Sequence, residues 1–205
     1  FENIEHECEL LFYQRYEWVP SHIEPQINNP DLQGGKYSDG QERWLEELSS
    51  GHPIVGDVET FPDSELAILD AQGIISICVM PILVDGRFWG VIGFDSVLKK
   101  RVWTPLELET LRLVSNVLAA AIQYERTARK LEKTEDELNS ILNRVDDVIY
   151  AIEPGQAHVI YANPALEKLT GYPLQHFYQT PNFWTSIIHH KDQTGAEIEK
   201  ILLDR

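Results

Sequence analysis

The feature that most constrains this chain is a long stretch without glycine or proline, which runs from Leu106 to Glu153. A helix start precedes it, because Thr104 suits an N-cap, Pro105 suits the first helical position and Glu107 can close a capping box. We therefore predict one helix from Thr104 to about Val145. A helix of about 40 residues is roughly 60 Å long, which exceeds the width of a small domain.

Apolar residues recur along this helix with heptad spacing. The two registers contain Val117, Ala121, Tyr124, Ala128, Leu131, Leu138 and Leu142. Between residues 125 and 137, almost all positions outside the heptad registers are polar. This part of the helix therefore buries too little to pack on its own domain. Glu135 interrupts the pattern and Tyr124 fits a seam poorly, which favours a short and marginal coiled coil. We expect these positions to form the relay seam of a parallel homodimer.

Charge and cysteine content exclude several classes of partner. The 205-residue chain has a formal net charge of -16 and 43% hydrophobic residues. The hydrophobic content predicts a folded core, and the negative charge argues against nucleic acid or an anionic membrane as partner. No apolar run in this segment has the length of a membrane span. Cys8 and Cys78 provide neither a disulfide framework nor zinc spacing, so we expect no metal and a cytoplasmic protein.

The remaining pattern predicts two α+β units joined by the long helix. Before that helix, strands are expected over residues 10–19 and 52–55, helices over 41–48 and 64–71, and a β-hairpin over 74–95. After it, strands over 146–152 and 158–161 precede helices over 163–170 and 177–192. The hairpin turns at Asp85-Gly86, and its strands are apolar on both faces, so it should lie centrally with cover on both sides. Gly90 and Gly93 mark bulges or close approaches in its second strand.

The hairpin carries the resemblance to a known family. The resembling elements are Gly73-Ile74-Ile75-Ser76, the run from Gly86 to Asp95, and Arg101-Val102-Trp103-Thr104. Together they resemble a GAF domain of the kind found in bacterial and archaeal multi-domain sensor histidine kinases. The resemblance covers residues 1–124 and implies an antiparallel sheet with flanking helices, the family's first helix lying before Phe1.

Two shorter resemblances follow along the chain. Glu125-Arg126-Thr127 resembles the signature of signalling helices, which assigns residues 125–140 to a connecting coiled-coil linker. Residues 141–205 resemble the N-terminal half of a PAS domain, through Ile160-Tyr161-Ala162-Asn163-Pro164 and Gly171-Tyr172. This second resemblance implies a partial α+β unit after the helix.

The GAF resemblance implies a small-molecule pocket between the sheet and its capping loops. Its candidate lining residues are Trp18, Trp44, Phe61, Cys78, Phe94 and Trp103. The alternative interpretation is that these side chains only fill a core.

No cofactor is predicted, although a non-covalent ligand fits the resemblance. A bilin-binding member typically has cysteine followed by histidine beside the chromophore, whereas Cys78 precedes Val79 and Cys8 precedes Glu9. A flavin adduct would need a cysteine between residues 139 and 205, where the sequence has none. We therefore expect neither a bilin nor a flavin adduct.

These observations predict a non-catalytic sensory and relay segment of a two-component histidine kinase. In this hypothesis the GAF unit binds a small molecule or partner, the helix relays the signal to PAS, and a kinase domain follows in the parent chain. No Ser-His-Asp set, phosphate loop or phosphoacceptor-histidine motif is present. The alternatives are a ligand-free GAF dimerisation scaffold and the sensor segment of a diguanylate cyclase. A redox enzyme of the GAF type is a further alternative, but it would need paired cysteines, which Cys78 does not supply.

Overall fold

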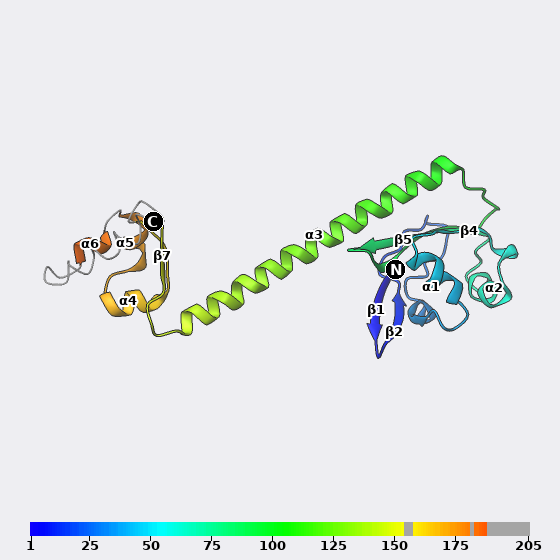
Figure 1. The fold of residues 1–205 in the computed structure, drawn as a ribbon. Coiled ribbons are helices and arrows are strands. Elements are labelled where there is room, and N and C mark those ends of the chain that lie inside the picture. The colour runs from blue at the N-terminus through cyan, green and yellow to red at the C-terminus, as the bar shows by residue number, and fades with distance from the viewer. Residues whose placement is uncertain (154–157, 181–182, 188–205) are drawn as a thin grey trace. The chain divides into compact units, whose positions relative to one another are not determined.

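The computed structural model describes residues 1–153, 158–180 and 183–187 (Figure 1). The chain divides into two compact units, Phe1–Ala128 and Arg129–Arg205, and the division falls within one continuous helix, α3 (Pro105–Arg144). Residues 188–192, the end of the last predicted helix, lie outside the described residues.

Unit 1 is built on a six-stranded antiparallel sheet in the order β3-β2-β1-β6-β5-β4. The strands are β1 (Glu2–His6), β2 (Glu9–Tyr13), β3 (Gln33–Lys36), β4 (Ile54–Asp57), β5 (Ser76–Val84) and β6 (Arg87–Ser96). The predicted hairpin is confirmed as β5 and β6. Asp85 and Gly86 both have positive φ at its tip, as a tight two-residue turn requires. Strand β4 lies at the edge of the sheet, as Pro53 before it predicts.

The first predicted strand differs from the structure. Strand β2 ends at Tyr13, and the backbone N–H of Gln14 donates to the carbonyl of Leu32, so residues 14–19 belong to a loop. Strand β1 pairs with β2, but its sequence is polar and largely exposed, so it has no hydrophobic pattern that predicts a strand. Gly90 lets β1 approach β6, because a Cβ at this position would collide with the carbonyl oxygen of Phe1.

Helices cover both faces of this sheet, as the hairpin sequence predicts. Helices α1 (Glu42–Ser49) and α2 (Asp63–Asp70) lie on one side, and the first part of α3 lies on the other (Figure 1). Two short 3₁₀ helices, η1 (Pro30–Leu32) and η2 (Val58–Thr60), lie in the connections. Within β5, Ile77 and Val79 join the core beneath α1 and α2, whereas Cys78 joins the core beneath α3.

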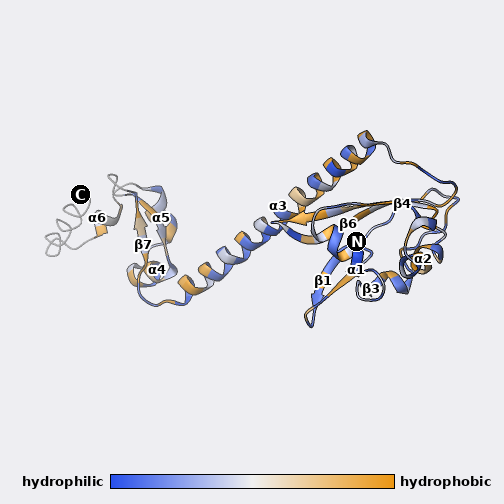
Figure 2. Cartoon of the chain, turned by 45° about the vertical axis from the view of Figure 1, so that its right-hand side comes forward, coloured by the Kyte–Doolittle hydropathy of each residue, from blue (hydrophilic) through white to orange (hydrophobic). Residues whose placement is uncertain are grey.

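The predicted start of the long helix is confirmed. The backbone N–H of Glu107 donates to Thr104 Oγ1 at 3.3 Å, and the backbone N–H of Thr104 donates to Glu107 Oε2 at 2.8 Å. The helix ends at Arg144, one residue before the expected end. Hydrophobic residues recur along it between hydrophilic ones (Figure 2).

The apolar residues of α3 divide into two groups. Leu108, Leu111, Ala119 and Ile122 pack against the sheet of unit 1. The expected seam positions face away from it, and the exposed fractions of Val117, Tyr124, Leu131 and Leu138 are 68%, 78%, 60% and 54%. Ala121 and Ala128 are also exposed, and Leu142 is partly buried. An apolar stripe therefore remains open along this face of the helix.

The described part of unit 2 begins with an antiparallel strand pair, β7 (Tyr150–Ile152) and β8 (Val159–Ala162). Helices α4 (Pro164–Thr170), α5 (Leu174–Gln179) and α6 (Phe183–Ile187) follow. Gly171 ends α4 with φ of 74°, which fits its predicted role as a helix stop. Val159, Ala162, Leu166 and Phe177 form the buried core of this part.

One buried side chain in unit 2, Asn163, caps the end of α3. Its Oδ1 accepts a hydrogen bond from the backbone N–H of Ile149 at 2.9 Å. Its Nδ2 donates to the carbonyls of Leu142, Val145 and Asp147 at 3.2, 3.3 and 2.9 Å. The last carbonyls of a helix lack partners within the helix, so Asn163 supplies the C-terminal cap from a distant point in the sequence.

We predict that Asn163→Ala destabilises unit 2 by roughly 2 to 4 kcal/mol, because each buried polar group that loses its partner costs about 1 to 3 kcal/mol. Hydrogen exchange would measure this as lost protection of the β7 and β8 amides, with the β5 and β6 amides unchanged. Asn143→Ala, at an exposed position of α3, is the matched control. Equal protection of unit 2 in both variants would contradict the capping role.

Candidate functional site

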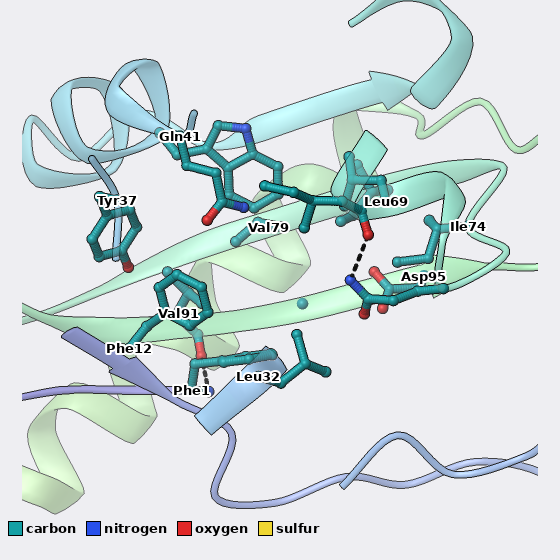
Figure 3. Close-up of a pocket in the computed structure, with 15 residues that line it drawn as sticks. Phe1, Phe12, Leu32, Tyr37, Gln41, Leu69, Ile74, Val79, Val91 and Asp95 are labelled. Atoms are coloured by element: carbon teal, nitrogen blue, oxygen red, sulfur yellow. Dashed lines mark hydrogen bonds between the residues drawn. The ribbon is translucent and has the colours of Figure 1, made fainter. Parts of the chain in front are cut away.

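A partly open pocket with a volume of about 70 Å³ lies between the sheet of unit 1 and its two short helices (Figure 3). Most of its wall is apolar, with aromatic rings from Phe1, Phe12, Tyr37 and Trp44 and aliphatic side chains from α2, β5 and β6. Three polar side chains complete the lining: Gln41, Gln72 and Asp95. The pocket is therefore mostly apolar with a few polar groups, as small-molecule sites usually are.

The alternation of side chains along β5 and β6 builds the floor of the pocket. Val91, Gly93 and Asp95 occupy one face of β6, because they are two residues apart. Val79 and Ile77 of β5 lie directly opposite Gly93 and Asp95 in the strand register. A Cβ placed on Gly93 would lie 3.8 Å from Asp95 Oδ1, so the carboxyl borders the space that the glycine leaves open.

A buried carboxylate joins the two helices above the pocket. Glu65 of α2 is only 2% exposed and accepts hydrogen bonds from Arg43 Nε and Nη2 at 2.8 and 2.6 Å. Its Oε2 also accepts from Trp44 Nε1 at 2.8 Å. A buried carboxylate is tolerated when it is paired in this way, and the same bonds fix the Trp44 indole that lines the pocket.

Aromatic rings close one end of the pocket. The centroids of Phe1 and Phe12 are 6.0 Å apart, and those of Phe12 and Tyr37 are 5.3 Å apart, both pairs in edge-to-face geometry. The Tyr37 hydroxyl donates to Asn3 Oδ1 at 3.0 Å. Burial raises the pKa of Tyr37, so this hydroxyl stays neutral and holds the ring in place.

Asp95 lies at the other end of the pocket, beside Leu69 and Ile74 (Figure 3), and it is exposed at the pocket opening. Desolvation raises the pKa of its carboxyl to about 6, and the charge of Glu17 contributes to the same shift. Backbone N–H groups of Gln26 and Ile27 donate to the Glu17 carboxylate at 3.0 and 2.7 Å and hold it in position. Among the described residues Asp95 has no ion-pair partner.

The structure does not bring the six predicted pocket residues together. Trp44 lines the pocket, and Phe61 packs at the margin of the same core, where the Arg43 guanidinium lies 5.3 Å from its ring. Trp18 stands in the loop after β2 and is 86% exposed. The interpretation of Trp18 as a core residue assumed a strand as far as Val19, and the chain leaves the sheet before that point.

The other three predicted residues lie on the opposite face of the sheet. Cys78 and Phe94 face each other across β5 and β6, and the Phe94 and Trp103 rings are 6.3 Å apart. All three belong to the core beneath α3. Strand alternation is the reason, since Cys78 and Phe94 are each one residue away from a residue that lines the pocket.

Sequence reasoning missed Phe12, Tyr37, Gln41 and Asp95. The strand pattern contained a signal for Asp95, because it is the one charged residue on the face of β6 that Val91 and Gly93 share. A charge on an otherwise apolar strand face is expensive unless it has a partner or a function. Tyr37 comes from a connection between elements, where periodicity gives no information. Gln41 begins the predicted helix over 41–48 and is the N-cap residue of α1, and the apolar positions of that helix do not mark it.

The family comparison identifies the class of domain. The GAF domain model matches residues 7–122, which is more than half of the chain, and the chain belongs to this family. Its sensory unit is therefore a GAF domain, in agreement with the predicted fold class.

Among characterised relatives, the chain is similar to the methanogenesis regulatory histidine kinase FilI of Methanothrix harundinacea. The two are 40% identical over 146 residues, which cover 71% of this chain and 16% of that kinase. This chain thus spans a small share of the length of the relative it matches.

A solved structure shows the same fold. The third GAF domain of Slr1393 from Synechocystis, in its photoproduct state, aligns with a TM-score of 0.50 and 24% identity, covering 57% of this chain and 77% of that one. The phycocyanobilin-bound GAF domain of a cyanobacterial phytochrome aligns with a TM-score of 0.46 and 19% identity, covering 55% and 67%.

The Slr1393 neighbour corrects one expectation from the sequence. The expectation against a bilin was wrong, because a GAF domain of the same fold is described in its photoproduct state, which requires a bound chromophore. The cysteine argument concerned covalent attachment alone, and the ability of a fold to enclose a tetrapyrrole does not depend on it.

Two properties of the described residues bear on membrane spanning and metal binding. None of their helices is both long and apolar enough to cross a membrane. No group of three or more histidine, cysteine, aspartate or glutamate side chains among them is arranged to hold a metal ion.

We predict that Asp95→Asn stabilises the chain above pH 6. The pKa of this carboxyl is about 6 in the folded chain, whereas its ordinary value is 3.8, so the folded chain binds the proton more tightly. Ionisation of the carboxyl therefore lowers the free energy of unfolding as the pH rises between these two values. Solvent screening limits the gain to about 1 kcal/mol, or about 2 to 4 °C in Tm.

The difference in Tm between Asp95→Asn and the unsubstituted chain should shrink as the pH falls below 6 and disappear near pH 4. Asp70→Asn, at an exposed position on α2, is the matched control and should show no such pH dependence. A constant difference across this range would contradict the assignment.

Proposed function

We propose that this chain is the sensory and relay segment of a two-component sensor histidine kinase, in which the GAF pocket takes up a small molecule. The observation that carries the proposal is the pocket itself. It is mostly apolar, and two of its polar side chains, Gln41 and Asp95, have no hydrogen-bond or ion-pair partner among the described residues. Similarity to a regulatory histidine kinase supports the sensory role.

The relay begins at strand β5, which separates the pocket from α3. Side chains alternate along this strand: Ile77 and Val79 face the pocket, whereas Cys78 and Met80 face α3. The Ser115 hydroxyl of α3 donates to the carbonyl of Pro81 in the same strand. A ligand that displaces β5 therefore acts on α3 through one layer of backbone.

The far end of α3 is held in unit 2 by Asn163, so a change in the helix reaches the start of that unit directly. We assign residues 141–205 to the N-terminal half of a PAS domain, which the motif around Asn163 supports. In a parallel dimer, the exposed stripe of α3 would form the seam, and its marginal apolar pattern suits two packings that differ by only a few kcal/mol.

The proposal also covers the output domain and the location of the parent protein. A kinase domain downstream would carry out protein-histidine phosphotransfer, and the histidine kinase relative supports this placement. We propose a cytoplasmic location, with support from two free cysteines, Cys8 and Cys78, since secreted proteins usually oxidise theirs.

One observation favours a second function, a ligand-free dimerisation scaffold. The pocket volume of about 70 Å³ is smaller than the roughly 300 to 1,000 Å³ typical of ligand sites. In a scaffold the same core would only support α3, and the seam would be the functional surface.

Native mass spectrometry of the chain purified from cells, with denaturing mass spectrometry and an absorbance spectrum, tests these two functions. The sensory function predicts a dimer with a bound small molecule that is released on denaturation. An empty dimer would favour the scaffold. An empty monomer would contradict the relay through α3.

The seam has its own test. Leu131→Gln together with Leu138→Gln should raise the dimer dissociation constant by about tenfold or more, because each buried leucine contributes roughly 1.5 to 3 kcal/mol. Lys130→Gln with Ser140→Gln, at exposed positions outside the seam, is the matched control. Analytical ultracentrifugation gives the readout, and unchanged association of the leucine variant would exclude this seam.

A further inference from the structure

We infer that the ligand of the GAF pocket is a small organic ammonium ion, with its charge against Asp95 and its apolar body against the pocket walls. The inference rests on the proposed ligand-sensing function and names the chemical class that this function would detect. Three features of the described pocket carry it: its charge, an unpartnered amide and the space above Gly93.

The charge of the pocket favours a cation. Asp95 is the only charged side chain among the lining residues, and Glu17 adds a second negative charge nearby. Asp95 is exposed at the open end of the pocket, and among the described residues no cationic side chain pairs with it. A cationic ligand would gain a charge-assisted contact with this carboxylate, whereas an anionic ligand would be repelled by both carboxylates and a neutral one would gain no ionic contact.

The amide of Gln41 offers a second polar contact. Gln41 is only 6% exposed, lines the pocket and points toward it in Figure 3. Its side chain makes no capping hydrogen bond to α1 and has no other hydrogen-bond partner among the described residues. The polar atoms of this amide are not among the fully buried atoms that lack a partner, so they remain open to a ligand, and a hydrogen bond to the ligand would contribute about 0.5 to 1.5 kcal/mol.

The walls and the volume of the pocket determine the polarity and the size of the rest of the ligand. Phe12, Tyr37 and Trp44 line the pocket, and the rings of Phe12 and Tyr37 lie at the end opposite Asp95, so they would contact the apolar body of the ligand. The volume of about 70 Å³ selects a compact molecule. Gly93 leaves space open beside the Asp95 carboxyl, since a Cβ there would have only Asp95 Oδ1 within 4 Å, at 3.8 Å.

The test compares three probes of similar size and different charge: isobutylamine, isobutanol and isobutyrate. Saturation-transfer NMR and calorimetric titration on the full chain, at pH 7.5 and low ionic strength, measure binding. We expect isobutylamine to bind about tenfold or more tightly than isobutanol, with isobutyrate weakest, because hydrogen bonds to a charged group contribute about 1.5 to 3 kcal/mol.

Two variants locate the site. Asp95→Asn should abolish the preference for the amine, whereas the exposed Asp70→Asn should retain it. Gly93→Val fills the pocket without changing its charge, and it should reduce binding of the amine and of isobutanol alike. The backbone of Gly93 does not have positive φ, so the chain is expected to accept valine there.

Each outcome separates the ligand class from the sensory function. Equal or tighter binding of isobutanol or isobutyrate, or an amine preference that survives Asp95→Asn, would overturn the ammonium assignment and leave a ligand-binding pocket. A co-purified ligand without positive charge would do the same. No binding of any probe together with an empty protein from cells would overturn both the assignment and the sensory function.

Discussion

Strand β5 is buried on both faces, and the organisation of unit 1 depends on this constraint. One face supplies Ile77 and Val79 to the floor of the pocket, and the other supplies Cys78 and Met80 to the core beneath α3. A strand with apolar residues on both sides requires cover on both sides. Helices α1 and α2 provide one layer and α3 the other, so the candidate ligand site and the candidate relay helix share a single strand.

The long helix is defined at both ends by specific polar contacts. At its start, Thr104 and Glu107 satisfy each other's backbone N–H groups. At its end, Asn163 donates to the carbonyl of Leu142 in the last turn and to that of Val145 directly after it. The middle of the helix has little to bury, and its helical state depends on uninterrupted helix-forming residues and on these two caps. An element of this kind is suited to transmit a change of packing, because it is continuous and only its ends are fixed.

The candidate site shows which features a strand pattern predicts and which it does not. The hairpin, its turn and its central position followed from the sequence, since turn chemistry and apolar runs are local signals. The resemblance to a GAF domain suggested Phe94 and Cys78 for the pocket, but strand alternation assigns them to the other face of the sheet. Asp95 and Gly93 share the pocket face with Val91, and a charge on that face was the available signal. Tyr37 and the exposed Trp18 lie in connections, whose paths depend on contacts distant in sequence.

The sequence by itself determined the helix from Pro105 to Arg144, the β5–β6 hairpin and the α+β class, because caps, turns and periodicity act within a few residues. Tertiary structure decided which face of the sheet became the pocket, that polar β1 would join the sheet, and that Asn163 would cap a helix that precedes it by many residues. These features depend on packing between segments distant in sequence. No local pattern specifies such packing, because its free energy exists only once the segments meet.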